Sequence, residues 1–191
     1  VTHIGKVVFN ECSQLTNIKV ISFKEKRIEY IEDQFLIYKE DPKSENYDTL
    51  LWVKPNITTA KIPPFIKTIG SYAFSECSSL TQITFSDTVT KIEDHAFKGC
   101  RQLNQIIIPS SVTHIGDGTF YNCSQLTKIA IPSSVTHIGK YSFSNCKNMT
   151  QITIPSSVTH IGDHAFYNCS QLTQITIPSS VTHIGDHAFY N

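Results

Sequence analysis

The 191-residue sequence contains few charged residues, no excess of either charge and no long apolar run. Charged residues make up 17% of the chain, and 16 Lys and Arg balance 16 Asp and Glu. A neutral chain lacks the basic field that attracts nucleic acids or anionic membranes, so we expect no nucleic-acid partner. No apolar segment approaches the ~20 residues that a membrane-spanning helix needs. Because 40% of the residues are hydrophobic, the chain is not intrinsically disordered. The remaining class is a folded protein that acts through contact with a partner.

The sequence is dominated by an internal repeat with a period of about 23 residues, the step between successive cysteines. Phenylalanine and isoleucine recur at the same step, and residues 150–168 and 173–191 are identical. The cysteine series consists of Cys77, Cys100, Cys123, Cys146 and Cys169. A unit this short cannot bury its apolar residues alone, whereas stacked units share one continuous core. The period therefore predicts an elongated solenoid.

Each unit begins with a short strand, as the copy that starts at Leu172 illustrates. Leu172, Ile175 and Ile177 form the L-x-x-L-x-L pattern of a leucine-rich repeat, and residues two apart face the same side of a strand. Pro178 ends the strand because proline has no backbone donor. The pattern predicts parallel strands, about 4.8 Å apart, along one face of the solenoid. We expect this face to be concave.

The second half of the unit is predicted to form the opposite wall. Val181 and Ile184 supply the inward pair of a short convex strand. Gly185 is expected to allow a tight turn, and Ala188 with Phe189 to lie on a short helical or 3-10 turn that closes the core. The predicted fold class is a β-rich leucine-rich-repeat solenoid that forms a single domain over residues 1–191.

The repeat is interrupted at about residues 21–56. Two β-prone runs, 35–38 and 50–53, flank the polar tract 39–48, which predicts an inserted β-hairpin with a solvated tip. Both a simple surface loop and a dedicated binding element fit this tip. Trp52, the single tryptophan, is expected to pack the hairpin onto the solenoid. An N-terminal repeat before the hairpin fits the period through Ile4, Phe9, Cys12, Leu15, Ile18 and Val20.

The repeating unit L-x-x-I-x-I-P-x-S-V-x-x-I-G-x-x-A-F-x-x-C resembles the BspA-type leucine-rich repeat, a family of bacterial and protozoan surface proteins. The interruption resembles the hairpin variant of that family in residues 30–38 and 50–55. Departures from the pattern are Glu93 in place of Gly, Met149 in place of Leu and Ser86 in place of Pro. The resemblance implies a surface-exposed adhesin that binds host or matrix proteins. It does not point to one partner, because the shared residues belong to the core.

The outward positions of the long predicted strands are the candidate binding face. They are polar and mostly neutral, which suits a broad protein-binding surface better than small-molecule chemistry; Thr and Gln are also ordinary solvent-facing strand residues. Ile107 and the lysines are the most informative members. The candidate residues are Lys19, Lys61, Gln82, Thr84, Gln105, Ile107, Lys128, Gln151, Thr153, Gln174 and Thr176.

Histidines and cysteines recur with the repeat, but we expect neither a metal site nor a cofactor. The first histidine column consists of His114, His137, His160 and His183, and the second of His95, His164 and His187. Stacked imidazoles suggest metal binding, yet a repeat aligns any residue type and no carboxylate column adjoins the first set. Solvent-facing histidines are the favoured interpretation, and aligned imidazoliums would repel one another below pH ~6.5. For most cysteines we expect reduced, buried thiols.

No constellation of catalytic residues stands out, so we expect no enzymatic activity. Ser, His and Asp all recur with the repeat, whereas an active site needs unique residues that converge in a cleft. The leading hypothesis is an extracellular or cell-surface module that binds proteins. The alternatives are an intracellular scaffold and a structural spacer. The chain begins and ends within a repeat, without polar caps, so we expect a fragment of a longer protein whose open ends associate end to end.

Overall fold

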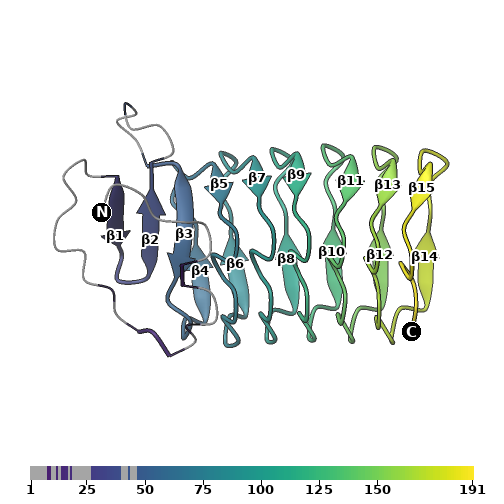
Figure 1. Cartoon of the computed structure of the whole chain (residues 1–191), viewed down its shortest axis with the longest axis horizontal. Coiled ribbons are helices and arrows are strands. Elements are labelled where there is room, and N and C mark those ends of the chain that lie inside the picture. The colour runs from purple at the N-terminus through teal and green to yellow at the C-terminus, as the bar shows by residue number, and fades with distance from the viewer. Residues whose placement is uncertain are drawn as a thin grey trace.

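The computed structural model describes residues 8, 9, 12, 14–16, 18, 27–39, 43 and 47–191. Most of the predicted N-terminal repeat, residues 1–20, lies outside these residues. From residue 57 onward the chain winds as successive coils, one for each sequence repeat, and each coil contributes one long and one short strand (Figure 1). The predicted leucine-rich-repeat solenoid is confirmed. Among the described residues, none forms a helix with the length and apolarity of a membrane span.

The long strands form one row along the solenoid, and the short strands form a second row (Figure 1). The long strands are β4 (Thr59–Lys61), β6 (Gln82–Thr84), β8 (Gln105–Ile107), β10 (Lys128–Ala130), β12 (Gln151–Thr153) and β14 (Gln174–Thr176). The short strands are β5 (Thr68–Ile69), β7 (Lys91–Ile92), β9 (His114–Ile115), β11 (His137–Ile138), β13 (His160–Ile161) and β15 (His183–Ile184). Paired strands are parallel, and equivalent residues of neighbouring repeats are in register, so that Ile129 lies opposite Ile152.

Alternation within each strand sends one side chain into the core and its neighbours to solvent. In β12 the central Ile152 is buried, whereas Gln151 and Thr153 are exposed. In the following short strand, β13, His160 is exposed and Ile161 is buried. The coils that contain β8 to β13 thus supply inward isoleucines from both walls, as the two-residue period predicts.

A column of phenylalanine rings runs through the centre of the solenoid. Phe97, Phe120, Phe143 and Phe166 are fully buried, with neighbouring ring centroids 5.3–5.5 Å apart and nearly parallel planes. Offset-parallel rings at this separation are attractive beyond the apolar area that they bury. The phenylalanines therefore hold successive coils at a constant spacing.

The predicted helical turn is not found in the described residues. The segment that carries each phenylalanine is a series of tight turns, with two residues of positive φ four positions apart. In one coil these are His164, at φ 55°, and Asn168, at φ 54°. A right-handed helix cannot pass through residues in the left-handed region, so the helix prediction is wrong at this point.

The repeated glycine serves close packing between coils, whereas the sequence predicted a tight turn at Gly185. A Cβ atom on Gly185 would lie 2.4 Å from the backbone nitrogen of Asp163 in the preceding coil, and one on Gly116 would lie 2.5 Å from that of Asp94. Neither glycine has a positive φ. The small residue is needed because the neighbouring backbone leaves no room for a side chain.

The predicted hairpin is present and belongs to a three-stranded antiparallel unit. β2 (Phe35–Tyr38) pairs with β3 (Thr49–Val53), and an additional strand, β1 (Ile28–Ile31), pairs with the other edge of β2. β3 then pairs in parallel with β5, so this unit extends the short-strand row (Figure 1).

The two faces of the hairpin unit join different apolar clusters. Phe35, Ile37 and Leu50 join the main core of the solenoid. Trp52 lies on the opposite side, packed with Leu36 and with its ring centroid 5.9 Å from that of Phe9. Trp52 is buried, as predicted, but against the N-terminal segment and away from the main core.

Five of the six cysteines form a column of buried thiols, and all six are free, as predicted for most of them. The Sγ atom of Cys123 donates a hydrogen bond to the carbonyl of Phe97 in the preceding coil at 3.2 Å, and Cys100 contacts Phe74 in the same way. Burial disfavours the thiolate and raises the pKa of Cys123 and of Cys169 to about 12. These thiols therefore act as small apolar groups that also bond adjacent coils.

The raised thiol pKa values predict a specific loss of stability at alkaline pH. The native state keeps the Cys123 proton, whereas the unfolded chain releases it above its ordinary pKa of 9.0, so stability is complete below pH 9 and falls as the pH rises toward 12. At pH 7 we expect Cys123→Ala to lower the free energy of unfolding by about 1–2 kcal/mol. At pH 10 this penalty should shrink by about 1.4 kcal/mol, because the variant lacks the ionisation that stabilises the unfolded wild type.

Chemical denaturation at pH 7 and pH 10 measures both free energies. Cys12→Ala, at the exposed cysteine, is the matched control and should leave the unfolding free energy unchanged at both pH values. A Cys123→Ala penalty that is equal at the two pH values would show that burial does not control this thiol.

Candidate protein-binding faces

The outward residues of the long strands form a continuous surface, which we call the long-strand face. It consists of Thr59, Lys61, Gln82, Thr84, Gln105, Ile107, Lys128, Ala130, Gln151, Thr153, Gln174 and Thr176, all of which are exposed. Every predicted site residue is among them except Lys19, which lies outside the described residues. The structure thus brings the described candidates together on one face.

Ile107 is the exception on this polar surface. Its side chain is 80% exposed, although the equivalent positions on β6 and β12 carry threonine. Its partner across the ladder is Ala130, whose short side chain leaves one flank of Ile107 uncovered. An apolar side chain that protrudes from a polar strand row adds nothing to the core, but single exposed apolar residues are common on protein surfaces, so the surroundings of Ile107 decide its significance.

Two hollows flank Ile107 on the long-strand face. One, of about 300 Å³, lies over β8, β10 and β12 and is lined by Ile107, Lys128 and Thr153 among others. The other, of about 490 Å³, lies between β6 and β8, where the described strands do not form one ladder, and is lined by Gln82, Asn104 and Ile107 among others. The surface therefore offers a protruding apolar side chain between two depressions.

The charge on the long-strand face is weakly positive. Lys61 and Lys128 are exposed at its outward positions, and these positions carry no carboxylate. Lys128 lies between Gln105 and Gln151 in the ladder. The face can therefore donate and accept neutral hydrogen bonds and attract isolated acidic groups, but it has no strong field.

The first histidine column lies on the outward side of the short strands and faces solvent, as the sequence favoured. The rings of His137 and His160 stack with their centroids 4.7 Å apart, and His183 continues the column at 5.8 Å. The Nδ1 atoms of His137 and His160 each lie 2.8 Å from the hydroxyl of the preceding threonine. Within the described ranges, no group of three or more His, Cys, Asp and Glu residues is arranged to hold a metal ion.

The second histidine column has a different environment, which the repeat alone did not predict. His95 and His164 are half-buried in the left-handed turns, and each packs against a tyrosine ring of the preceding coil: His95 is tilted against Tyr72 at 4.8 Å, and His164 stacks on Tyr141 at 4.7 Å. These histidines therefore pack along the edge of the solenoid and are less available to a ligand than the first column.

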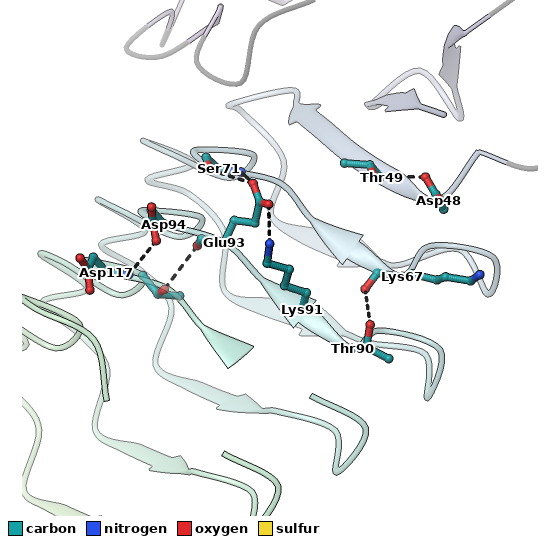
Figure 2. Close-up of polar contacts among 10 residues, drawn as sticks. Asp48, Thr49, Lys67, Ser71, Thr90, Lys91, Glu93, Asp94 and Asp117 are labelled. Atoms are coloured by element: carbon teal, nitrogen blue, oxygen red, sulfur yellow. Dashed lines mark hydrogen bonds and ion pairs between the residues drawn. The ribbon is translucent and has the colours of Figure 1, made fainter. Parts of the chain in front are cut away.

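Glu93, which replaces the repeated glycine, is held by a local network (Figure 2). One carboxylate oxygen accepts hydrogen bonds from the backbone N–H and the hydroxyl of Ser71, at 3.2 and 2.9 Å, and the other pairs with Lys91 at 3.0 Å. The side chain of Glu93 is only 14% exposed. The substitution is tolerated because the carboxylate turns toward donors in the preceding coil.

A row of aspartates follows the glycine column on the same side of the solenoid (Figure 2). The backbone N–H of Asp117 donates to Oδ1 of Asp94 at 2.9 Å, and that of Lys140 donates to Oδ1 of Asp117 at 2.8 Å. Lys140 also pairs with Asp163 at 2.8 Å, which lowers the pKa of Asp163 and raises that of Lys140. These carboxylates therefore link each coil to the next by accepting a hydrogen bond from a backbone N–H of that next coil.

A third hollow, of about 720 Å³, lies on the short-strand side, between the first histidine column and this aspartate row. It was not predicted from the sequence. The sequence signal at this place is the glycine column, which contributes no side chains between the two rows.

The sequence matches the BspA type leucine-rich repeat region over residues 67–191, in six copies. A comparison with curated protein sequences gave no match. Among solved structures, a leucine-rich cell surface protein from Faecalibacterium prausnitzii is 29% identical, with a TM-score of 0.70 over 84% of this chain and 51% of that one.

Two other solved structures are similar. A leucine-rich repeat protein from T. pallidum is 30% identical, with a TM-score of 0.64 over 67% of this chain and 60% of its own. One from Bacteroides ovatus is 28% identical, with a TM-score of 0.60 over 74% and 44%. The chain therefore spans about half of the length of the structures that it matches.

Ile107→Thr tests whether Ile107 has a role in the fold. Because the side chain is 80% exposed and threonine occupies the equivalent position of other strands, we expect the unfolding free energy to change by less than about 0.5 kcal/mol. The adjacent buried residue provides the contrast: Ile106→Thr should cost about 2–4 kcal/mol. Denaturant titration of both variants measures the difference, and similar losses would mean that Ile107 supports the coil.

Proposed function

The chain belongs to the BspA-type leucine-rich repeat family, and on this basis we propose that it is a non-enzymatic cell-surface module that binds another protein through the long-strand face. A solenoid in which side chains recur at fixed intervals suits recognition by an extended surface. The coarse role, a leucine-rich repeat suited to protein interaction, follows from the family. The site, the adhesive role and the surface location are our proposal.

The exposure of Ile107 carries this proposal. Binding energy at protein interfaces concentrates in a few apolar or aromatic side chains near the centre, surrounded by polar contacts that exclude water. Ile107 has this setting, since Gln105 and Lys128 lie beside it and a hollow lies on either side. The complementary partner has an apolar recess for Ile107 and acidic groups that reach Lys61 and Lys128.

Binding would be additive along the face. Each coil offers a Gln or Lys and one further side chain, and each such contact is weak by itself. Several weak contacts made at once by a rigid surface give useful affinity because the face is ordered before the partner arrives. Divergence between coils then sets specificity: β6, β12 and β14 share the outward pair Gln and Thr, whereas β4, β8 and β10 differ from it.

The proposed surface location is supported by the Faecalibacterium prausnitzii relative, which is a cell surface protein. An intracellular scaffold would use the same face without adhesion. A purely structural spacer is favoured by one observation, namely that residues 150–168 and 173–191 are identical and therefore present the same surface twice. Labelling of intact cells with a membrane-impermeant reagent separates the surface module from the scaffold.

Binding should depend on Ile107, Lys61 and Lys128 without a change in stability. We expect Ile107→Lys to weaken binding to a matrix protein at least tenfold, and Lys61→Glu with Lys128→Glu to weaken it several-fold, mostly through slower association. Biosensor measurements against a panel of purified extracellular-matrix proteins give affinities and rates, and thermal melts of each variant confirm folding.

Lys147→Gln, at an exposed lysine outside both rows of strands, is the matched surface control and should bind as the wild type does. If no substitution on the long-strand face alters binding of a matrix protein that the wild type binds, the assignment of this face is wrong. If the wild type binds none of the panel, the proposed role in matrix adhesion is wrong.

We further propose that the 191-residue chain associates with itself through its last coil. Ile177 and Ile184 are 40% and 46% exposed there, whereas their counterparts Ile154 and Ile161 in the preceding coil are buried. β14 and β15 each have a pairing partner on one side only among the described strands. An apolar surface with unpaired strand edges is complementary to another such edge.

The apparent mass in light scattering should therefore rise with concentration over the micromolar range. Ile184→Lys should keep the chain monomeric, because it places a charge within the contact, while leaving matrix binding intact. Ile107→Lys should do the reverse, so the two variants serve as controls for each other. A wild type that stays monomeric at high concentration would contradict this proposal and leave the long-strand face unaffected.

A further inference from the structure

The hollow on the short-strand side is a direct product of the repeated Thr-His-Ile-Gly sequence. In the coils that carry this sequence His points outward and Ile points toward the core, and the following Gly packs without a side chain against the backbone of the preceding coil. Stacked coils align Gly116, Gly139 and Gly162 as the floor of a trough. We call this feature the histidine trough; its two walls are the first histidine column and the aspartate row.

The floor of the trough cannot fill with side chains. A Cβ atom on Gly139 would lie 2.7 Å from Oδ1 of Asp117 and 2.9 Å from the carbonyl oxygen of Gly116. On Gly162 it would lie 2.6 Å from the backbone nitrogen of Lys140. Close packing of the coils therefore keeps glycine in place, and a channel of about 720 Å³ follows from that packing.

The charges that line the trough are predominantly negative at neutral pH. Asp94, Asp117 and Asp163 line it, and the one lysine, Lys140, is paired with Asp163. Among the described residues, Asp94 and Asp117 take part in no ion pair. Each holds a backbone N–H of the next coil with Oδ1, which fixes the carboxylate.

We propose that the histidine trough binds an extended segment of a second protein that carries lysine or arginine at alternate positions. Charge complementarity selects a cationic occupant, and a channel that runs along the coils suits an extended chain. In such a chain, alternate side chains are ~6.8 Å apart, so long basic side chains can reach carboxylates on coils ~4.8 Å apart. This site lies on the other row of strands from the long-strand face and does not depend on the proposed function.

The histidine wall makes this binding sensitive to pH. The imidazoles of His114, His137, His160 and His183 line the trough, and a protonated imidazole carries a positive charge. The other charged groups that face them are Asp94, Asp117, Asp163 and Lys140, and Lys91 on the adjacent β7 is paired with Glu93. Protonation therefore reverses the balance of charge in the trough, and a basic segment that binds at pH 7.5 is released at pH 5.5.

The test uses the 191-residue chain and a fluorescein-labelled ten-residue peptide of alternating Lys and Ser. Fluorescence anisotropy at pH 7.5 and low salt should detect saturable binding, with no binding of the corresponding Glu-Ser peptide. Asp94→Asn with Asp117→Asn should weaken binding about fivefold or more, since each variant removes a charge but keeps the oxygen that accepts the backbone N–H. Asp87→Asn, at an exposed carboxylate outside the trough, is the control and should bind as the wild type does.

The pH dependence is tested with His137→Gln combined with His160→Gln. For the wild type we expect binding at least tenfold weaker at pH 5.5 than at pH 7.5, and for the double variant a much smaller change. NMR spectra provide a second readout, in which the Lys-Ser peptide should shift the imidazole signals of His137 and His160 and leave the amide signal of Ile107 in place.

Equal binding of the two peptides, or aspartate variants that bind like the wild type, would overturn the trough as a site for basic segments. An equal drop in affinity at pH 5.5 in the wild type and the histidine variant would overturn the role of the histidines. Thermal melts of all variants at both pH values separate these results from loss of the fold.

Discussion

The contact between the backbones of successive coils is the constraint on which the rest of this structure depends. At the glycine column one coil lies so close to the next that a single Cβ atom would meet backbone atoms at about 2.4–2.9 Å. The phenylalanine rings in the interior stack at a matching interval, and the cysteine thiols donate to carbonyl groups one coil away. Because all three contacts recur once in every coil, the coils can neither slip nor separate locally without losing several of them together. Stability of this kind is shared between neighbours along the chain.

The same spacing organises the surface. Outward residues at equivalent positions of successive coils form columns, because close packing in the core fixes the spacing of the coils. The fold itself does not require these outward residues to be aligned. The informative positions are those at which the residue type changes along a column. Ile107 replaces threonine on the long-strand face, Lys140 interrupts the aspartate row, and Glu93 replaces glycine. Each change has a local physical account in exposure, an ion pair or a hydrogen-bond network.

The sequence was sufficient to predict the solenoid, its period, the inward residues of both walls and the buried cysteines. These features depend on the pattern of apolar residues, which is periodic and local. The hairpin strands were also predictable, since two β-prone runs flank a polar tract. β1 was missed because this stretch belongs to no repeat, and its short alternation at Ile28, Glu29 and Tyr30 was not used as a strand signal.

Other features depend on contacts that cross from one coil to the next, and these could not be predicted. The left-handed turns at His164 and Asn168 replace the expected helical turn; His and Asn are enriched at positive φ, but most residues of either type lie elsewhere, so the sequence did not predict these turns. The reason for the repeated glycine lies in the backbone of the neighbouring coil, a full repeat away along the chain. The histidine trough, likewise, follows from what the glycine leaves empty. Of the candidate face, the sequence predicted the described positions, whereas the hollows beside Ile107 required the packed coils.

The identity of the last two coils has a consequence for how such a protein changes over generations. Since equivalent residues of neighbouring coils are in register in every ladder, gene recombination that adds or deletes one whole coil preserves each type of contact along the interior. Such a change alters only the number of coils along which the surface residues are arranged. Insertion of a single residue within a strand has the opposite effect, because it turns apolar side chains outward. This architecture therefore permits variation in steps of one coil and penalises anything smaller.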